Sequence, residues 1–154
     1  MAKSPMHPTC ILEKDKVSGK VDQKLYTCMI GSLLNLTASR LDILFNVFLC
    51  ARFQSNPRES HLTTDKRIFR YLKGTTKRGL CYGKSREYKL VGYCDADYAG
   101  DRLKRKTTSV SCQFLRDNLI SWSCKRQSTI ALSTVEAEYI YASGCSTEFL
   151  WMKI

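Results

Sequence analysis

Apolar residues recur at helical spacing through the first half of the chain, after a polar arm. Residues 1–21 carry Pro5, Pro8 and Gly19 without any periodicity, which predicts an extended arm or linker. From Asp22 onward, apolar side chains return at steps of three and four, which predicts a first helix. Its expected apolar stripe is Leu25, Met29, Leu33 and Leu36.

Two further helices are expected before residue 79. Ser39 and Asp42 have the spacing of a capping box, which predicts a second helix from that point. Ser60 is expected to cap a third helix, and Gly74 to end it in a left-handed conformation. Their apolar positions are Leu41, Leu44, Phe45 and Phe48 in the second helix, and Leu62, Ile68, Phe69 and Leu72 in the third. Residues 22–78 are therefore expected to form a helical segment.

From residue 79 the pattern changes to short β-rich runs, "GLCY", "KLVGYC", "SVSCQFL" and "NLISWSC". They predict three or four antiparallel strands, the last two joined by a tight turn at 116–118. Ser133 and Glu136 then have capping-box spacing, which predicts a helix toward the C-terminus. The expected fold class is α/β, with a helical segment followed by strands and one helix in residues 79–154.

Charge and cysteine content narrow the class of protein. The 154 residues contain 25 Lys and Arg against 14 Asp and Glu, a net charge of +11, which favours nucleic acid over an acidic protein or a membrane as partner. Eight cysteines occur without any C-x-x-C pair, and we expect them to be buried free thiols. No apolar run of about 18 residues appears, so we expect a soluble, intracellular chain, in cytoplasm or nucleus.

Two carboxylates are candidates for a metal site. Helical steps from Glu138 give the apolar residues Ala142, Cys145, Phe149 and Met152, so Glu138 is expected to face inward and to need a partner. Asp95 ends the run "KLVGYC" and could meet it, and paired carboxylates suit magnesium. The alternative for Asp95 is a strand-end Asx turn. Asp97 and Asp101 are interpreted as turn residues.

Four stretches together resemble the C-terminal part of the polyprotein of copia-type LTR retrotransposons. They are "YTCMIGSLLNLTASRLDI", "HLTTDKRIFRYLKGTT", "YCDADYAGDRLKRKTTS" and "LISWSCKRQSTIALSTVEAEYI". The resemblance implies that residues 22–78 come from the end of the reverse transcriptase. It also implies that residues 79–154 are the N-terminal part of a ribonuclease H domain, which cuts RNA in RNA–DNA hybrids.

The resemblance implies catalytic, metal-ligating roles for Asp95 and Glu138. Further carboxylates of that family lie beyond this helix, so we expect an incomplete set and weak binding of magnesium or manganese. We leave the enzyme assignment open and expect no cleavage by the chain alone, unless the remainder of the polyprotein joins it. The alternative is a non-catalytic retrotransposon remnant that at most binds nucleic acid.

A basic cluster is expected to follow the phosphates of a hybrid or another nucleic acid. Its members are Arg102, Lys104, Arg105, Lys106, Lys125 and Arg126. The alternative is a solvated hairpin loop. Arg116 and Val110 stand where the family pattern has glycine, so we expect strained backbone at both positions.

Overall fold

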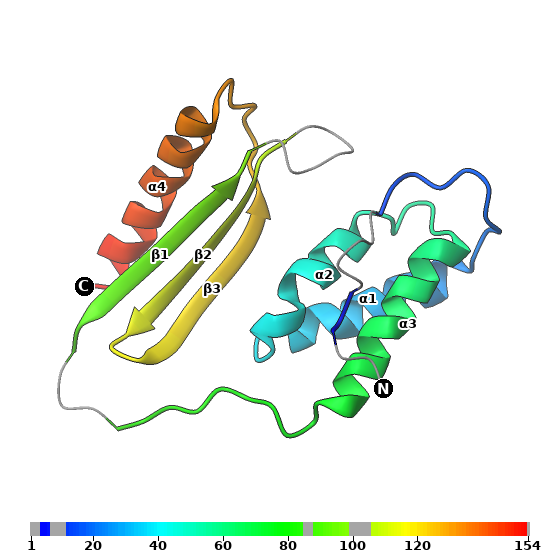
Figure 1. The fold of residues 1–154 in the computed structure, drawn as a ribbon, viewed down its shortest axis with the longest axis horizontal. Coiled ribbons are helices and arrows are strands. Elements are labelled where there is room, and N and C mark those ends of the chain that lie inside the picture. The colour runs from blue at the N-terminus through cyan, green and yellow to red at the C-terminus, as the bar shows by residue number, and fades with distance from the viewer. Residues whose placement is uncertain (1–3, 7–11, 85–87, 99–105, 154) are drawn as a thin grey trace. The chain divides into compact units, whose positions relative to one another are not determined.

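The computed structural model describes residues 4–6, 12–84, 88–98 and 106–153. The chain divides into two compact units, Met1–Leu80 and Cys81–Ile154. The first contains α1 (Gln23–Leu36), α2 (Leu41–Ala51) and α3 (Glu59–Gly74). The second contains β1 (Leu90–Asp97), β2 (Thr108–Leu115), β3 (Asn118–Arg126) and α4 (Thr134–Trp151) (Figure 1). The predicted α/β class, helices first and then strands and one helix, is confirmed.

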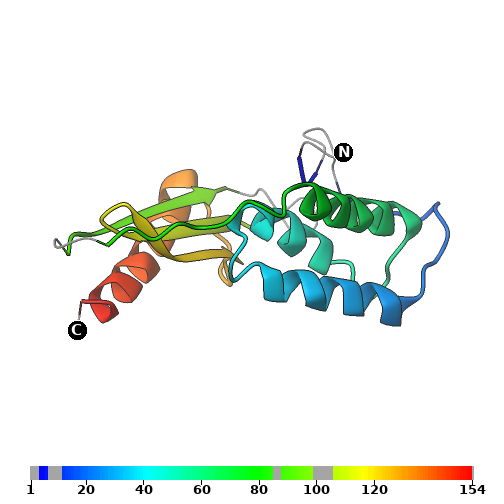
Figure 2. The ribbon, with the colours of Figure 1, turned by 90° about the horizontal axis from the view of Figure 1, so that it is seen from below.

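The three helices of the first unit lie beside one another (Figure 2), and their buried side chains form one apolar core. The core residues are Met6, Tyr26, Ile30, Leu33, Ile43, Val47, Cys50, Ile68 and Tyr71. On α1 the buried positions are Tyr26, Ile30 and Leu33, whereas Leu25 and Leu36 are exposed, so the predicted stripe is rotated by one position. Tyr26 can be buried because its hydroxyl donates a 2.9 Å hydrogen bond to the carbonyl of Cys50.

The predicted helix ends were partly wrong. The N-cap of α2 is Arg40 rather than Ser39, because the Asp42 carboxylate is held by the Arg40 guanidinium instead of forming a capping box. The N-cap of α3 is Arg58, and the Ser60 hydroxyl instead donates to Asp15 at 2.7 Å. Gly74 is the last residue of α3, and no glycine in the described ranges has a positive φ.

The second unit is built on an antiparallel sheet of order β1-β2-β3. The run 79–82 was expected to be a strand but lies outside the sheet. It is followed by Gly83, whose backbone N–H and C=O both bond to the side chain of Asn118, the first residue of β3, rather than to strand backbone. Arg116, between β2 and β3, has a φ of 56°, so the strain expected there is confirmed. The expectation of strain at Val110 is wrong, because Val110 lies inside β2 and has no positive φ.

Helix α4 covers one face of this sheet and runs antiparallel to β1 (Figure 1). Near its start, the Gln127 side chain donates to the carbonyl of Ala137 at 2.8 Å and to the Ser109 hydroxyl at 2.9 Å. Near its end, the Phe149 ring lies against Gly92, where an added Cβ would approach the ring to 3.2 Å. The first turn of α4 therefore lies beside the last residues of β1.

The expectation that the cysteines are buried was mostly wrong. Cys50 and Cys124 are buried, while Cys28, Cys81 and Cys94 are exposed. Cys112 and Cys145 are half-buried, all seven are free thiols, and Cys10 lies outside the described residues. No helix in the described part of the chain is long and apolar enough to span a lipid bilayer.

Candidate nucleic-acid interface

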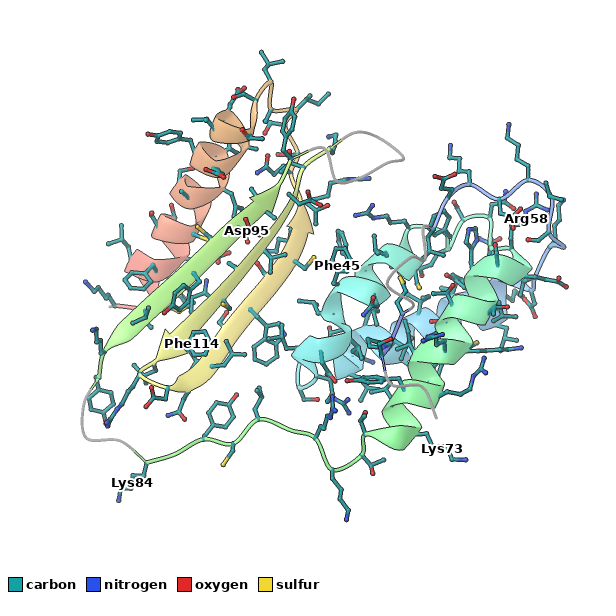
Figure 3. All side chains as sticks on the ribbon, in the orientation of Figure 1. Phe45, Arg58, Lys73, Lys84, Asp95 and Phe114 are labelled. Atoms are coloured by element: carbon teal, nitrogen blue, oxygen red, sulfur yellow. The ribbon has the colours of Figure 1, made fainter. Side chains whose placement is uncertain are left out.

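Asp95 is an exposed residue on β1, near the end of the strand (Figure 3). In the strand register it lies opposite Val110 of β2. The neighbouring Ser111 faces α4, because its hydroxyl bonds to Ser123, which in turn bonds to the hydroxyl of Tyr141. Successive side chains of a strand alternate between faces, so Val110 and Asp95 lie on the face opposite α4.

Glu138 is also exposed, which corrects the expectation that it faces the core. The fully buried position in the first turns of α4 is Ala137, one residue earlier. Ala137, Tyr141 and Phe149 are four and eight residues apart and face the sheet. Phe149 belongs to the predicted stripe, so the prediction fails at the start of the helix, where Ala137 and not Glu138 is buried. Glu138 consequently lies beside this stripe rather than within it.

The structure orients the two predicted metal ligands differently. Asp95 and Glu138 come from the same end of the sheet, but Asp95 faces away from the helix that carries Glu138. No group of three or more His, Cys, Asp or Glu side chains able to hold a metal occurs among the described residues. Magnesium is commonly bound through one or two carboxylates with waters completing its octahedral coordination, so a site at Asp95 and Glu138 stays a prediction.

The predicted basic cluster is only partly described. Arg102, Lys104 and Arg105 lie outside the described residues. Lys106 donates a 2.5 Å hydrogen bond to the carbonyl of Ser128, so its ammonium group is already engaged. Lys125 lies 3.9 Å from Glu148.

Arg126, the last member of the cluster, is exposed at the end of β3. Lys106 and Lys125 are members whose charge is partly satisfied within the fold. Phosphate binding by this cluster stays a prediction, because half of its members lie outside the described residues.

A basic stripe on α3 was missed by the sequence reasoning. It consists of Lys66, Arg70 and Lys73, spaced four and three residues apart, with Lys77 following in the turn after the helix. All four side chains are exposed, and Figure 3 shows Lys73 extending away from the helix. None of them forms an ion pair within the described ranges, although the Arg70 guanidinium donates a 3.3 Å hydrogen bond to the carbonyl of Lys66. The spacing was visible in the sequence, but only the buried face formed by Ile68 and Tyr71 shows which side of the helix is free.

The charge distribution supports this stripe. The first 80 residues contain fourteen basic and six acidic residues, a net charge of +8 out of +11 for the whole chain. One of those acids, Asp65, precedes Lys66 but is fully buried without a hydrogen-bond partner. Burial raises the pKa of Asp65 to about 7, so near neutral pH this carboxyl is only partly ionised and offsets less positive charge than an exposed aspartate would.

Comparison with known proteins places the chain among retrotransposon proteins. It is 40% identical over 149 residues to the Retrovirus-related Pol polyprotein from transposon TNT 1-94 of Nicotiana tabacum, covering 96% of this chain and 11% of that protein. It is 36% identical to the corresponding polyprotein from transposon RE1 of Arabidopsis thaliana, covering 97% of this chain and 10% of that protein. No family model and no solved structure matches the chain.

A shorter relative is covered almost completely. The chain is 36% identical over 130 residues to Secreted RxLR effector protein 161 of Plasmopara viticola, covering 84% of this chain and 92% of that protein. The order of helices, strands and final helix, together with these similarities, defines a segment of a retroelement polyprotein. The chain belongs to the copia-type retrotransposon Pol polyprotein family, and it spans about a tenth of the length of the two Pol relatives named above.

Proposed function

We propose that this chain is a nucleic-acid-binding segment of a reverse transcriptase and ribonuclease H polyprotein, and that α3 binds the phosphate backbone. The observation that carries the proposal is the stripe of Lys66, Arg70 and Lys73 on the exposed face of a helix whose other face is the core. Phosphate contacts supply most of the affinity of sequence-independent nucleic-acid binding. RNA–DNA hybrid is the proposed ligand, because it is the substrate of the family's ribonuclease H.

The dimensions of the stripe suit a polyanion. Lys73 lies seven positions after Lys66, which corresponds to a rise of about 10 Å along the helix. A nucleic-acid strand carries one phosphate per about 3.4 Å of axis, so the stripe is long enough to face about three phosphates. The side chains are long and flexible, which favours contacts with backbone phosphates over recognition of the base sequence.

Binding should be measured with a labelled RNA–DNA hybrid over a range of salt concentrations. Replacing Lys66, Arg70 and Lys73 by Ala should weaken binding and reduce the slope of log K against log salt by about 0.9 per lost cation. The matched control replaces the exposed residues Lys14, Lys16 and Lys24, which removes the same charge from the same unit. Equal losses in the two triple variants would show that net charge alone acts, and would refute the α3 surface.

A second candidate function is metal-dependent hydrolysis of the RNA strand with Asp95 and Glu138 as ligands. It is favoured by the direction of α4, which brings the first turns of the helix to the end of the sheet where β1 finishes. Because the chain is about a tenth of its Pol relatives, we assign this activity to the whole polyprotein and expect no cleavage by the chain alone.

Incubation of labelled hybrid with the purified chain in magnesium or manganese tests the second candidate. Cleavage that disappears in both Asp95→Asn and Glu138→Gln would assign hydrolysis to this chain. Cleavage that persists in both variants would come from a contaminating nuclease.

A further inference from the structure

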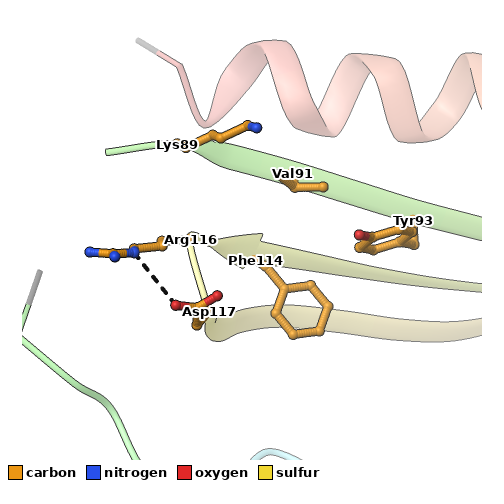
Figure 4. A pocket seen from close by; sticks show the side chains of 6 residues that line it. All are labelled: Lys89, Val91, Tyr93, Phe114, Arg116 and Asp117. Carbon is orange, nitrogen blue, oxygen red and sulfur yellow. Dashed lines mark ion pairs between the residues drawn. The ribbon is translucent and has the colours of Figure 1, made fainter. Parts of the chain in front are cut away.

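A cavity lies on the sheet face opposite α4, at the end of the sheet where β1 begins and β2 turns into β3. Its volume is about 430 Å³, within the range of small-molecule sites. It is lined by Lys89, Val91, Tyr93, Phe114, Arg116 and Asp117 (Figure 4). The residues therefore combine apolar and aromatic side chains with two cations and one carboxylate.

The aromatic part of the cavity is an open platform. Tyr93 on β1 and Phe114 on β2 are diagonal neighbours, because Val91 is the direct partner of Phe114 and Cys112 that of Tyr93. Their ring centroids are 5.9 Å apart with an interplanar angle of 85°. Tyr93 is 62% exposed, so its ring is held by Phe114 while much of its surface remains available. A nucleic-acid base is a flat partner for such a surface.

The cationic part adjoins the platform. The backbone N–H of Arg116 donates a 2.6 Å hydrogen bond to the carbonyl of Lys89, which holds the two residues side by side. Lys89 is exposed, and the Arg116 guanidinium lies 3.5 Å from the carboxylate of Asp117. Two cationic side chains thus emerge at the edge of the cavity within reach of a group bound on the rings.

We propose that this cavity binds single-stranded RNA or DNA, with a base stacked on Tyr93 and Phe114 and the adjoining phosphate at Lys89 and Arg116. The proposal goes beyond binding of a hybrid duplex by α3, and different residues in the other unit carry it. Single-stranded sites elsewhere combine aromatic rings with cations in this way. A base inside a duplex is stacked on its neighbours, so the site selects unpaired nucleotides.

The charges disfavour an apolar occupant. An apolar protein segment or a second copy of the sheet would have to desolvate Lys89, Arg116 and Asp117 without supplying complementary groups. A nucleotide supplies both a π-surface and an anion.

The cavity is separate from the part of the predicted basic cluster that the structure describes on β3. Arg126 pairs with Thr108 at the opposite end of β2 from the cavity.

The test is fluorescence anisotropy with a labelled eight-nucleotide oligothymidylate at fixed low salt. Tyr93→Leu should weaken binding about tenfold, within the range measured for loss of one stacked base. The matched control is Tyr139→Leu, which removes another exposed tyrosine of the same unit, 74% exposed on α4, and should leave affinity unchanged. Lys89 lies outside the strands, so Lys89→Ala tests the site even if Tyr93→Leu unfolds the sheet unit. Lys89→Ala should weaken oligonucleotide binding and reduce its dependence on salt concentration.

Three results would overturn the proposal. Equal oligonucleotide affinities of the Tyr93→Leu and Tyr139→Leu variants would show that no base stacks on Tyr93. An unchanged affinity and salt slope in Lys89→Ala would show that Lys89 contacts no phosphate. Loss of self-association in sedimentation, with unchanged oligonucleotide binding in Tyr93→Leu, would identify a second copy as the occupant. In a chain whose Lys66, Arg70 and Lys73 are already replaced by Ala, Tyr93→Leu should still weaken oligonucleotide binding. This result separates failure of the cavity site from failure of the duplex-binding surface on α3.

Discussion

The hydroxyl of Tyr71 on α3 donates a 2.7 Å hydrogen bond to the carboxylate of Asp42 on α2. The same carboxylate accepts two hydrogen bonds from Arg40, at 2.9 and 2.8 Å, and these are the main reason that the pKa of Asp42 is lowered. Arg40 also donates to the carbonyl and hydroxyl of Thr75. The start of α2 is therefore tied to the end of α3, the helix that carries the basic stripe.

Loss of the Tyr71 hydroxyl should destabilise the helical unit. Tyr71→Phe keeps the buried ring but removes a hydrogen bond to a charged group, and we expect the free energy of unfolding to fall by about 1–2 kcal/mol. Thermal unfolding followed by circular dichroism measures the effect. Tyr139→Phe removes an exposed hydroxyl and should leave the midpoint unchanged. Indistinguishable midpoints for the two variants would show that the contact contributes nothing to stability.

Asp65 should make the stability of the helical unit depend on pH. The folded pKa of about 7 is above the ordinary value of 3.8, because the side chain is buried, so the folded state binds the proton more tightly. Stability should therefore be greatest below about pH 4, fall as pH rises toward 7 and then level off. Asp65→Asn should remove that fall and raise the melting temperature at pH 8.

Melting curves at pH 4 to 8 provide this comparison. The control is Glu59→Gln, which alters an exposed carboxylate of the same helix. A parent chain whose stability does not decline between pH 4 and 7 would contradict the protonation of Asp65.

Arg116→Gly should stabilise the sheet unit. A non-glycine residue at a φ of 56° carries strain of about 1 kcal/mol, which glycine relieves. Asp117→Gly is the control, because Asp117 has no positive φ and only the flexibility of the unfolded chain increases. Chemical denaturation should show a gain for the first variant and none for the second, and a loss in Arg116→Gly would show that its side-chain contacts outweigh the strain.

Magnesium should bind only weakly. Asp95 lies on the sheet face opposite α4, the helix that carries Glu138. We therefore expect a dissociation constant for magnesium no tighter than the millimolar range, a binding free energy of about −4 kcal/mol. Calorimetry of the parent chain, Asp95→Asn and Glu138→Gln provides the measurement. Micromolar binding that both substitutions abolish would show that the two carboxylates converge in solution.

The secondary structure could be predicted because it depends on local pattern. The three β-rich runs that became β1, β2 and β3 and the Ser133 cap of α4 were all expected, and the Ser133 hydroxyl does accept from the backbone N–H of Glu136. The strain at Arg116 was expected because the family pattern has glycine at that position of the turn. The family resemblance likewise depended on the order of residues alone.

The faces of the elements depended on tertiary packing. The sequence allowed either Glu138 or Ala137 to face the sheet from the start of α4. The hydrogen bonds from the Gln127 side chain to Ala137 and Ser109 hold the Ala137 side against the sheet. It allowed Asp95 to face α4, but pairing with Val110 turned the carboxylate to the other side.

The sequence by itself determined the family, the order of elements and the positive charge, because these follow from residue identity and short-range periodicity. Only the tertiary structure decided which charges are free and which carboxylates meet. It left Lys66 and Arg70 exposed, buried Asp65 immediately before Lys66, and placed Tyr93 beside Phe114. The physical reason is that burial and strand register depend on contacts between segments distant in the chain, which no local pattern specifies.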